Sequence, residues 1–396
     1  MNNIRSVTLA GSERSALTDV DELGAVPAEQ QIELTIVLPR RAELPPEVLA
    51  GGRSLTRDQL SSGYGADPDT AERVRSAMVE AGLRVTGVDL GSRRILVVGQ
   101  ASEVAAVFGT EITMVRDRGN GIAHRHRTGA LRLPAELDGL VLGVLGLDNR
   151  PQVRAGVRIF AGNTPGRSYT PLQLGAVYRF PQHTDGTGQT VAIIELGGGY
   201  TQQDLDSYFS GLTLATPHVS AVGVDGSKND PGTDTNVDTE VALDIEVAGA
   251  LAPKASYVVY FAPNTDKGFL DAISQAAHAD PAPAAMSISW GQSEDQWTQQ
   301  GRTAMDQAFA DAAALGVTVC AAAGDNGSSD NQQDGKPHVD FPASSPNVLG
   351  CGGTSLLADA TGVVTSETVW NSGAGGGATG GGVSDAFPVP SWQTAV

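Results

Sequence analysis

The segment Thr190-Val-Ala-Ile-Ile-Glu-Leu-Gly-Gly-Gly-Tyr-Thr201 indicates the fold class of this chain. Its first seven residues are a nearly continuous apolar run, as in a strand that is covered on both faces of its sheet. Three glycines then form a turn, and Thr201-Gln-Gln-Asp204 resembles the capped start of a helix. A buried strand that turns directly into a helix is the building unit of parallel α/β sheets.

The same unit recurs through the second half of the chain. Further buried strands are predicted at residues 256–261, 285–289, 317–322 and 348–351, and helices at residues 239–250, 267–279 and 303–314. This alternation predicts an α/β fold with a doubly wound parallel sheet. In such sheets, ligands bind at the carboxyl ends of the strands.

The first part of the chain has an α+β pattern. Strands are predicted at residues 31–38, 83–90, 95–98 and 111–115, and helices at residues 69–81 and 102–108. The order β-α-β-β-α-β is ferredoxin-like. A polar segment with Gly and Pro follows, so we predict a first domain at 1–148, a linker at 149–170 and the sheet domain at 171–396.

Charged residues are distributed unevenly along the 396 residues, whose net charge is −19. Residues 1–170 contain 20 Arg, no Lys and 20 Asp or Glu, whereas residues 171–396 contain 6 Lys or Arg and 25 Asp or Glu. The acidic half argues against a nucleic-acid partner, since phosphates need basic patches. It suits a protein that works in acid, where protonated carboxyl groups no longer repel one another.

Apolar runs and cysteines limit the cellular setting. No run reaches the roughly 20 apolar residues of a membrane helix, and residues 1–24 show no signal-peptide pattern. We therefore expect no membrane association. Cys320 and Cys351 lie in apolar, strand-like surroundings, which favours buried free thiols over a single disulfide bridge.

Glu240 and Asp244 are two carboxylates within an otherwise apolar run, which predicts a mostly buried helix. Positions i and i+4 share a helix face, and like charges there repel unless they share a proton or take part in a reaction. The pair therefore favours acid/base chemistry. A solvated acidic face is the alternative.

Three more candidate residues are predicted at strand ends. Asp325 follows a strand on a glycine-lined turn, Glu195 ends the strand at 190–196, and Trp290 ends another. Their convergence indicates a site, whereas Asp325 alone is equally well explained as a turn-capping residue. The six histidines are dispersed, which argues against a Ser-His-Asp peptidase and against a helical zinc pair.

Five ordered segments resemble the sedolisins, the serine-carboxyl peptidases, and in particular their kumamolisin branch. They are Ala192-Ile-Ile-Glu-Leu-Gly-Gly-Gly-Tyr200, Glu240–Leu251, Ser287-Ile-Ser-Trp-Gly291, Ala321-Ala-Ala-Gly-Asp-Asn-Gly327 and Gly380-Gly-Gly-Val-Ser384. The resemblance implies an incomplete subtilisin-like peptidase domain, preceded by an inhibitory and folding-assisting prodomain. It also implies a secreted endopeptidase that acts in acid on proteins or peptides, and we expect a monomer.

The resemblance implies roles for individual residues. Glu240 corresponds to the general base toward a serine, Asp244 to its carboxylate partner and Asp325 to the oxyanion-hole acid. The supporting hydrogen-bond network and substrate cleft correspond to Glu195, Ser289, Trp290 and Gly291. A carboxylate base must be ionised while an oxyanion donor must keep its proton, and both conditions are met together only in acid.

The chain departs from the family pattern near its C-terminal end. The sedolisin serine lies in a Gly-Thr-Ser turn that opens a helix after the Gly-Gly-Gly-Val-Ser segment, and neither this nucleophile nor the family's calcium ligands precede Val396. Ca²⁺ is thus implied only by resemblance, with no metal site in this chain. Ser355 is rejected as a substitute because a strand-turn-strand pattern, with its turn at 359–362, follows it. We expect a truncated chain, inactive alone, with a natural fragment as the alternative.

The uneven charge also suggests how the prodomain is released. In acid its arginines stay charged while carboxylates of both halves lose their charge, so attraction turns into repulsion. Cleavage is expected within residues 149–170, near Ser168-Tyr169. Two alternative functions are an inactive interaction or folding module and nucleotide binding at Gly197-Gly-Gly199. The glycine segment lacks the G-x-G-x-x-G spacing of a nucleotide-binding loop.

Overall fold

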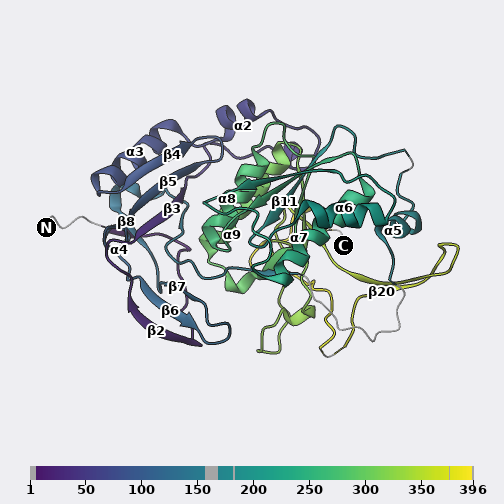
Figure 1. Cartoon of the computed structure of the whole chain (residues 1–396). Helices are drawn as coiled ribbons and strands as arrows, with labels where there is room; N and C mark the ends of the chain where they lie inside the picture. Colours follow the sequence, from purple (N-terminus) through teal and green to yellow (C-terminus); the bar gives the residue numbers. More distant parts are fainter. Residues whose placement is uncertain (1–5, 157–167, 182, 374, 395–396) are drawn as a thin grey trace. The chain divides into compact units, whose positions relative to one another are not determined.

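The computed structural model describes residues 6–156, 168–181, 183–373 and 375–394 (Figure 1). The chain forms two compact units, each with its own sheets. The first unit combines the N-terminal 152 residues with Asn264–His278 and Trp297–Gly316. The second consists of Val153–Pro263, Ala279–Gln296 and Val317–Val396. None of the described helices is long and apolar enough to cross a membrane.

The main sheet of the first unit has the predicted ferredoxin-like order. Its antiparallel strands lie in the order β4-β5-β3-β9, and helices α3 and α4 connect them in the β-α-β-β-α-β sequence. A core of buried aliphatic side chains and Phe108 fills the space between sheet and helices. The bounds are β3 Gln31–Val37, α3 Pro68–Glu80, β4 Arg84–Asp89, β5 Arg94–Gln100, α4 Ala101–Val107 and β9 Gly143–Leu145.

The fourth strand of this sheet differs from the prediction. Residues 111–115 were predicted to supply it, but β6 (Thr113–Asp117) pairs instead with β2 (Val20–Ala25) and β7 (Ala123–His126) in a separate sheet. The fourth strand is β9, whose outer edge is closed by a distant side chain: the Gln300 amide exchanges two hydrogen bonds with the Val144 backbone, at 2.9 and 3.2 Å. Local alternation does not report such a long-range partner.

Three buried aspartates on helices α8 and α9 form ion pairs with arginines of the N-terminal segment. Both helices, α8 (Asp266–Ala277) and α9 (Gln299–Ala314), belong to the first unit. Asp271 also accepts a hydrogen bond from the hydroxyl of Thr35, at 2.7 Å. The pairs are Arg14 with Asp266 at 3.3 Å, Arg94 with Asp271 at 2.7 Å, and Arg40 and Arg93 with Asp311 at 2.5 and 2.6 Å.

The ion pairs of Asp271 and Asp311 persist in moderate acid. Burial acts to raise the pKa of Asp311, but Arg93, His278 and Arg40 outweigh it and lower that pKa to about 2. In the same way Arg94, Lys267 and Thr35 outweigh burial and lower the pKa of Asp271. These two carboxylates stay ionised near pH 4, so the predicted conversion of attraction into repulsion is wrong for the pairs of Asp271 and Asp311.

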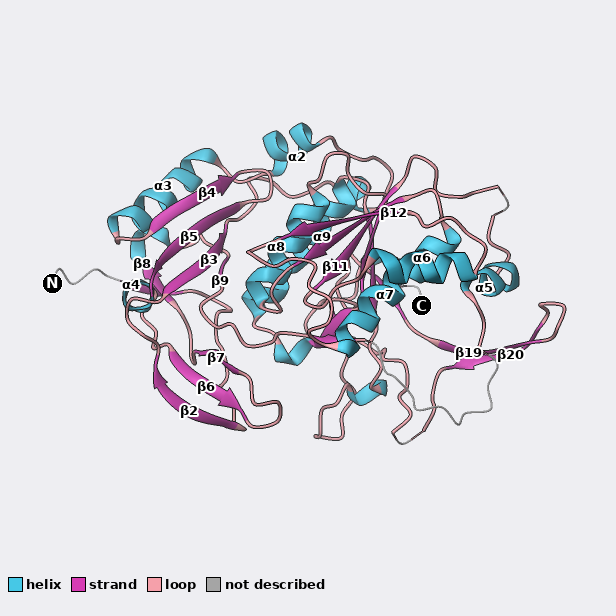
Figure 2. Ribbon diagram, in the orientation of Figure 1, coloured by secondary structure: helices cyan, strands magenta, loops and turns pink. Residues whose placement is uncertain are grey.

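The second unit contains the predicted parallel sheet (Figure 2). Its six strands lie in the order β12-β13-β11-β14-β16-β18 and all pair in parallel. All five predicted strands are present, whereas the edge strand β12 was not predicted because only half of its side chains are partly buried. The bounds are β11 Thr190–Glu195, α6 Gln202–Gly211, β12 His218–Gly223, α7 Thr235–Leu251, β13 Ser256–Phe261, β14 Ala285–Ile288, β16 Thr318–Ala322 and β18 Leu349–Cys351.

Shorter elements complete the two units. The helices are α1 Pro46–Leu49, α2 Arg57–Tyr64 and α5 Pro171–Val177, with 3₁₀ turns at Ala135–Leu137, Glu294–Gln296, Gly327–Ser329 and Ser391–Gln393. The strands are β1 Ser6–Thr8, β8 Arg132–Pro134, β10 Arg154–Ala155, β15 Trp290–Ser293, β17 Asp340–Phe341, β19 Thr354–Ala358 and β20 Val364–Val369. Ser355 lies in the β19–β20 hairpin, opposite Thr368, as the rejection of this serine as nucleophile requires.

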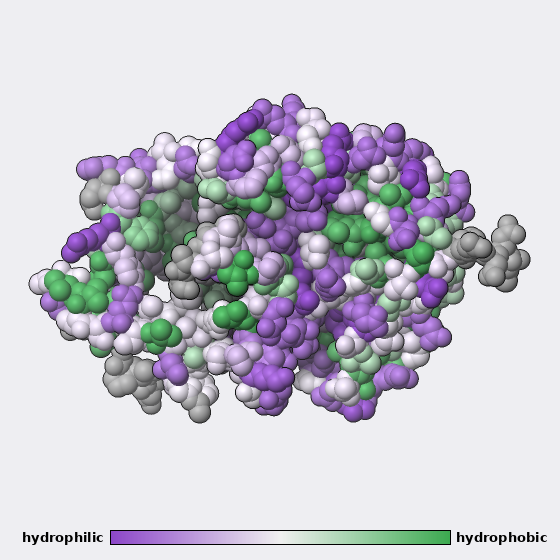
Figure 3. Space-filling model, turned by 180° about the vertical axis from the view of Figure 1, so that it is seen from behind, coloured by the Kyte–Doolittle hydropathy of each residue, from purple (hydrophilic) through white to green (hydrophobic). Residues whose placement is uncertain are grey.

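Four side chains are more exposed than predicted. Both cysteines are free thiols, but Cys320 is only half-buried, and Cys351 is exposed because β18 is the edge strand of the sheet. Helix α7 was predicted to be mostly buried, yet Leu243 and Val247 are 43% and 37% exposed. Figure 3 shows that hydrophobic residues on the face seen there are gathered in separate places among hydrophilic ones.

The Asp311 cluster provides a test of the packing in the first unit. Replacing Asp311 by Ala leaves two buried guanidinium groups without their carboxylate, so we expect the free energy of unfolding to fall by about 3–5 kcal/mol. Urea denaturation of the whole chain measures this change. In the matched control, Glu72→Ala, an exposed pair with Arg75 is removed and no measurable change is expected. Equal stability of D311A and the parent chain would contradict the assignment.

Candidate active site

Helix α7 places Glu240 and Asp244 beside the end of strand β11. The helix begins four residues earlier than predicted, because the Asp234 carboxylate caps the backbone N–H groups of Asn236 and Val237. Glu240 is 2% exposed, and α7 packs against β11, which ends at the fully buried Glu195.

The glycine turn after β11 is tied to the same helix. Asp238 accepts hydrogen bonds from the backbone N–H groups of Gly199 and Gly232, at 2.8 and 2.7 Å. Gly198 has φ +63°, and a Cβ there would lie 2.8 Å from a methyl carbon of Val237. The turn therefore needs glycine to pass this close to the helix.

Two short hydrogen bonds connect the carboxyl groups of the site to the β14–β15 junction. The hydroxyl of Ser289 donates to Asp244, with both carboxylate oxygens at 2.8 Å. The indole N–H of Trp290 donates to Oε2 of Glu195 at 2.9 Å. The structure thus brings together Glu195, Asp244, Ser289 and Trp290 as predicted. Trp290 begins a strand, β15, rather than ending one.

Burial and mutual repulsion favour the neutral forms of these acids. Burial raises the pKa of Asp244 to about 6, despite the hydrogen bond from Ser289. Burial, followed by the nearby charges of Asp244 and Glu240, raises the pKa of Glu195 far above its ordinary range. At pH 4 to 5 Glu195 and Asp244 therefore carry protons, which leaves Glu240 without charged carboxylate neighbours in this cluster.

Asp325 follows β16 on the predicted glycine turn, and a second glycine-rich segment holds this turn by backbone pairing. The Asp325 carbonyl accepts from the Ala378 N–H at 3.1 Å, and the Gly324 carbonyl accepts from the Gly380 N–H at 2.8 Å. A Cβ on Gly380 would lie 1.8 Å from the Ala323 carbonyl oxygen. Only glycine permits this approach, which explains the glycine run at 380–382 in part.

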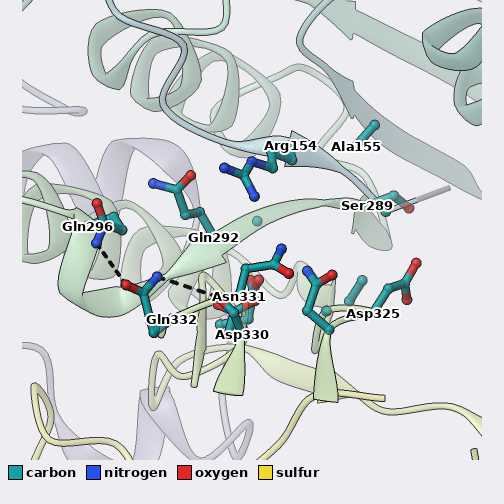
Figure 4. A pocket seen from close by; sticks show the side chains of 15 residues that line it. Arg154, Ala155, Ser289, Gln292, Gln296, Asp325, Asp330, Asn331 and Gln332 are labelled. Atoms are coloured by element: carbon teal, nitrogen blue, oxygen red, sulfur yellow. Dashed lines mark hydrogen bonds between the residues drawn. The ribbon is translucent and has the colours of Figure 1, made fainter. Parts of the chain in front are cut away.

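A cleft of about 500 Å³ lies between Asp325 and the β14–β15 junction. Figure 4 shows the labelled Arg154, Ala155 and Ser289 along one wall and Asp325, Asp330 and Asn331 along the other. The lining is polar and rich in small residues. It consists of Arg154, Ala155, Gly156, Ser289, Gly291, Gln292, Gln296, Ala322, Gly324, Asp325, Asn326, Asp330, Asn331, Gln332 and Asp340.

The chain's own residues 154–156 line this cleft as an added strand. Strand β10 pairs antiparallel with β15, with Arg154 opposite Gly291 and Ala155 opposite Trp290. The next N–H, that of Gly156, donates to the Ser289 carbonyl at 2.9 Å. A Cβ on Gly156 would lie 4.0 Å from Oε2 of Glu240. An extended peptide in this position therefore passes directly beside Glu240.

Sequence reasoning missed the added strand and the acid at the base of the cleft. Asp340 is 5% exposed, and its Oδ1 has no hydrogen-bond partner among the described residues. Burial, followed by the charges of Asp330 and Asp325, raises its pKa to about 8. Gly291 is needed beside it, since a Cβ there would lie 1.9 Å from Oδ1. No local signal in Val339-Asp-Phe-Pro342 distinguishes this aspartate from a turn residue.

The described residues do not form a metal centre. No group of three or more His, Cys, Asp or Glu side chains in the described part of the chain is arranged to hold an ion. We therefore assign no calcium ligand and derive no chemical step from calcium.

Comparison with known protein families identifies the class of protein to which the chain belongs. Residues 186–374 match the subtilase family, and residues 18–150 match the pro-kumamolisin activation domain. The protein is therefore a serine-type peptidase of subtilisin-like fold that is preceded by an activation prodomain.

The relatives narrow the class to one family. The chain is 45% identical to kumamolisin of Bacillus sp. strain MN-32, covering 97% of this chain and 73% of that protein. It is 30% identical to sedolisin of Pseudomonas sp. strain 101, covering 87% of this chain and 62% of that protein. A solved structure of Pseudomonas sedolisin, a serine-carboxyl proteinase complexed with pseudo-iodotyrostatin, matches 58% of this chain and 67% of its own, with a TM-score of 0.53 and 30% identity. The chain belongs to the sedolisin family, as a pro-form.

Asp340 gives the site a testable pH dependence. Its pKa in the folded protein, about 8, exceeds the ordinary value of 3.8. The folded state therefore holds this proton more tightly, and the resulting stability is complete below pH 3.8 and is lost as the pH rises toward 8. We expect Asp340→Asn, which cannot ionise, to lose less stability than the parent chain between pH 4 and pH 8.

Urea unfolding at intervals across this pH range measures the difference. Asp334→Asn is the control, because Asp334 is exposed and its pKa is lowered by His338. Parallel stability curves for D340N and the parent chain would show that Asp340 is ionised in the folded cleft.

Proposed function

We propose that this chain comprises the prodomain and the larger part of an acid-acting serine-carboxyl endopeptidase. Glu240 is the general base, Asp244 its carboxylate partner and Asp325 the oxyanion donor. The nucleophilic serine belongs to a part of the protein beyond Val396. The supporting observation is the path of residues 154–156, whose backbone passes beside Glu240 in the cleft that Asp325 also lines.

In this proposal each group has one proton task. The serine hydroxyl attacks the substrate carbonyl carbon and transfers its proton to Glu240, while the protonated Asp325 donates a hydrogen bond to the developing oxyanion. The intermediate collapses, the peptide C–N bond breaks, and Glu240 returns the proton to the leaving amine. Water then repeats the sequence on the acyl-enzyme, which releases the acid product and restores the serine.

The acid requirement follows from the electrostatics of the cluster. Above pH 6 Asp244 ionises. The negative charges of Asp244 and Glu240 then lie in the same buried site as Glu195. At lower pH the protons on Asp244 and Glu195 leave Glu240 as the one carboxylate of the cluster that needs to be ionised. Acid therefore supplies a single base together with neutral neighbours, and protonates the oxyanion donor.

The β10–β15 pairing supports peptides as substrates and the prodomain connection as an inhibitor. Backbone hydrogen bonds to an added strand fix an extended peptide without reading its side chains. The segment that now holds this position belongs to the chain itself, so it excludes a substrate from the same backbone groups. Secretion and a monomeric state, which the family resemblance implies, complete the proposal.

Replacing Glu240 by Gln tests the base. The amide is isosteric but accepts no proton, so kcat/KM for peptide cleavage at pH 4 should fall at least about 100-fold. The measurement uses the full-length natural protein after activation. Glu246→Gln is the matched control, since it makes the same change on the partly exposed side of α7 and should leave kcat/KM within about twofold.

Two results would contradict this proposal. Undiminished cleavage by E240Q would remove Glu240 as the base. A full-length natural protein that folds and cleaves no peptide between pH 3 and pH 6 would favour an inactive interaction or folding module instead.

A further inference from the structure

His124 is a buried histidine without hydrogen bonds in the activation domain. It lies in β7 and is 3% exposed, and neither ring nitrogen has a hydrogen-bond partner among the described residues. On β6 it is paired with Val115, which is 1% exposed. A neutral imidazole is tolerated in such a place, but a charged one needs acceptors for both of its N–H groups.

The charged groups around His124 do not supply these acceptors. They are Asp148, Arg150 and His126, of which Arg150 and His126 oppose a positive charge. The backbone of Ile122 favours the charged ring, but it can serve only one of the two N–H groups. Asp148 favours it, but its carboxylate is already bound by the Arg150 guanidinium, at 2.5 and 2.9 Å, and by the backbone N–H of Arg127. Asp148 also remains ionised in acid, because His126, Arg14 and Arg150 outweigh burial and lower its pKa.

We propose that His124 is the acid-sensitive element of the activation domain. Its protonation places an uncompensated cation beneath the β2-β6-β7 sheet and opens this sheet, which loosens the prodomain as the medium becomes acidic. This inference rests on the proposed peptidase activity in acid only for the biological purpose of the opening. The opening of the sheet itself requires no catalysis.

The sign of the effect follows from linkage. Burial, assisted by Arg150 and His126, outweighs Asp148 and the Ile122 backbone and lowers the pKa of His124 below its ordinary value of 6.5. The opened state therefore binds more protons than the closed state below pH 6.5, and acid shifts the equilibrium toward opening. Asp271 on α8 and Asp311 on α9 have lowered pKa values and do not respond in this range. His124 thus provides a response at a pH where the ion pairs provide none.

Hydrogen exchange of the whole chain tests the proposal. The parent carries Glu240→Gln, so that self-cleavage cannot interfere, and exchange is read by mass spectrometry in peptides covering β6 and β7. After correction for intrinsic rates, we expect the opening equilibrium constant of the parent to rise about threefold or more between pH 7 and pH 4.5. In His124→Phe, which keeps a ring and cannot be protonated, that rise should be absent.

Two controls separate the possible outcomes. His218→Phe changes an exposed histidine of β12 and should keep the rise. An equal rise in H124F and the parent overturns the proposal. If H124F fails to fold, an NMR titration of the His124 ring in the parent decides: a midpoint below pH 6 supports the proposal, and one at or above pH 6 overturns it. Because every sample lacks Glu240, failure here is distinguishable from failure of the proposed peptidase mechanism.

Discussion

The second unit depends on one electrostatic constraint: three carboxyl groups lie within one buried site, and they cannot all be ionised. Glu195 ends a strand that is buried on both faces, and Glu240 is almost completely buried on the helix packed against it. Burying three carboxylate charges away from water, without cations to balance them, costs far more free energy than folding supplies. Some of these carboxyl groups must therefore be protonated. The pKa values of Glu195 and Asp244 are raised, and the hydrogen bonds from Trp290 and Ser289 orient these two groups without neutralising them. The preference of Glu195 and Asp244 for their protonated forms is thus a property of the core of this unit.

The first unit contains buried carboxylates with the opposite behaviour. Asp311 and Asp271 are as buried as Glu195, yet guanidinium groups and Lys267 lower their pKa values. The uneven distribution of arginine along the chain therefore has a structural use, since the arginines of the N-terminal segment compensate the aspartates of α8 and α9. Acid neutralises Asp244 and Asp340, whose pKa values are raised, and leaves Asp271 and Asp311 charged. A fall in pH can thus favour the proposed chemistry without breaking the ion pairs of Asp271 and Asp311 in the first unit.

The sequence was sufficient wherever a signal is local. The apolar run at 190–196 predicted β11, the i and i+4 spacing placed Glu240 and Asp244 on one turn of α7, and the glycines around Asp325 predicted its turn. It failed where a partner lies far along the chain. The edge of β9 is set by Gln300, and the short strand β10 has only two residues and no alternation to reveal its pairing with β15. Asp340 was missed for the same reason, because its environment is made by Gly291 and Asp330, which lie in other segments.

The β14–β15 junction connects cleft occupancy to the acid cluster through adjoining atoms. The carbonyl of Ser289 accepts the N–H of Gly156, while its hydroxyl donates to Asp244. The next residue, Trp290, pairs through its backbone with Ala155 and through its indole with Glu195. A strand in the cleft therefore binds the backbone of Ser289 and Trp290, while Asp244 and Glu195 bind the side chains of the same two residues. Because side chains point out of the plane of a sheet and backbone hydrogen bonds lie within it, the backbone edge can bind a peptide while these side chains bind carboxyl groups. A peptide that fixes this edge also fixes the donors to Asp244 and Glu195, so binding and orientation of the acids are geometrically linked.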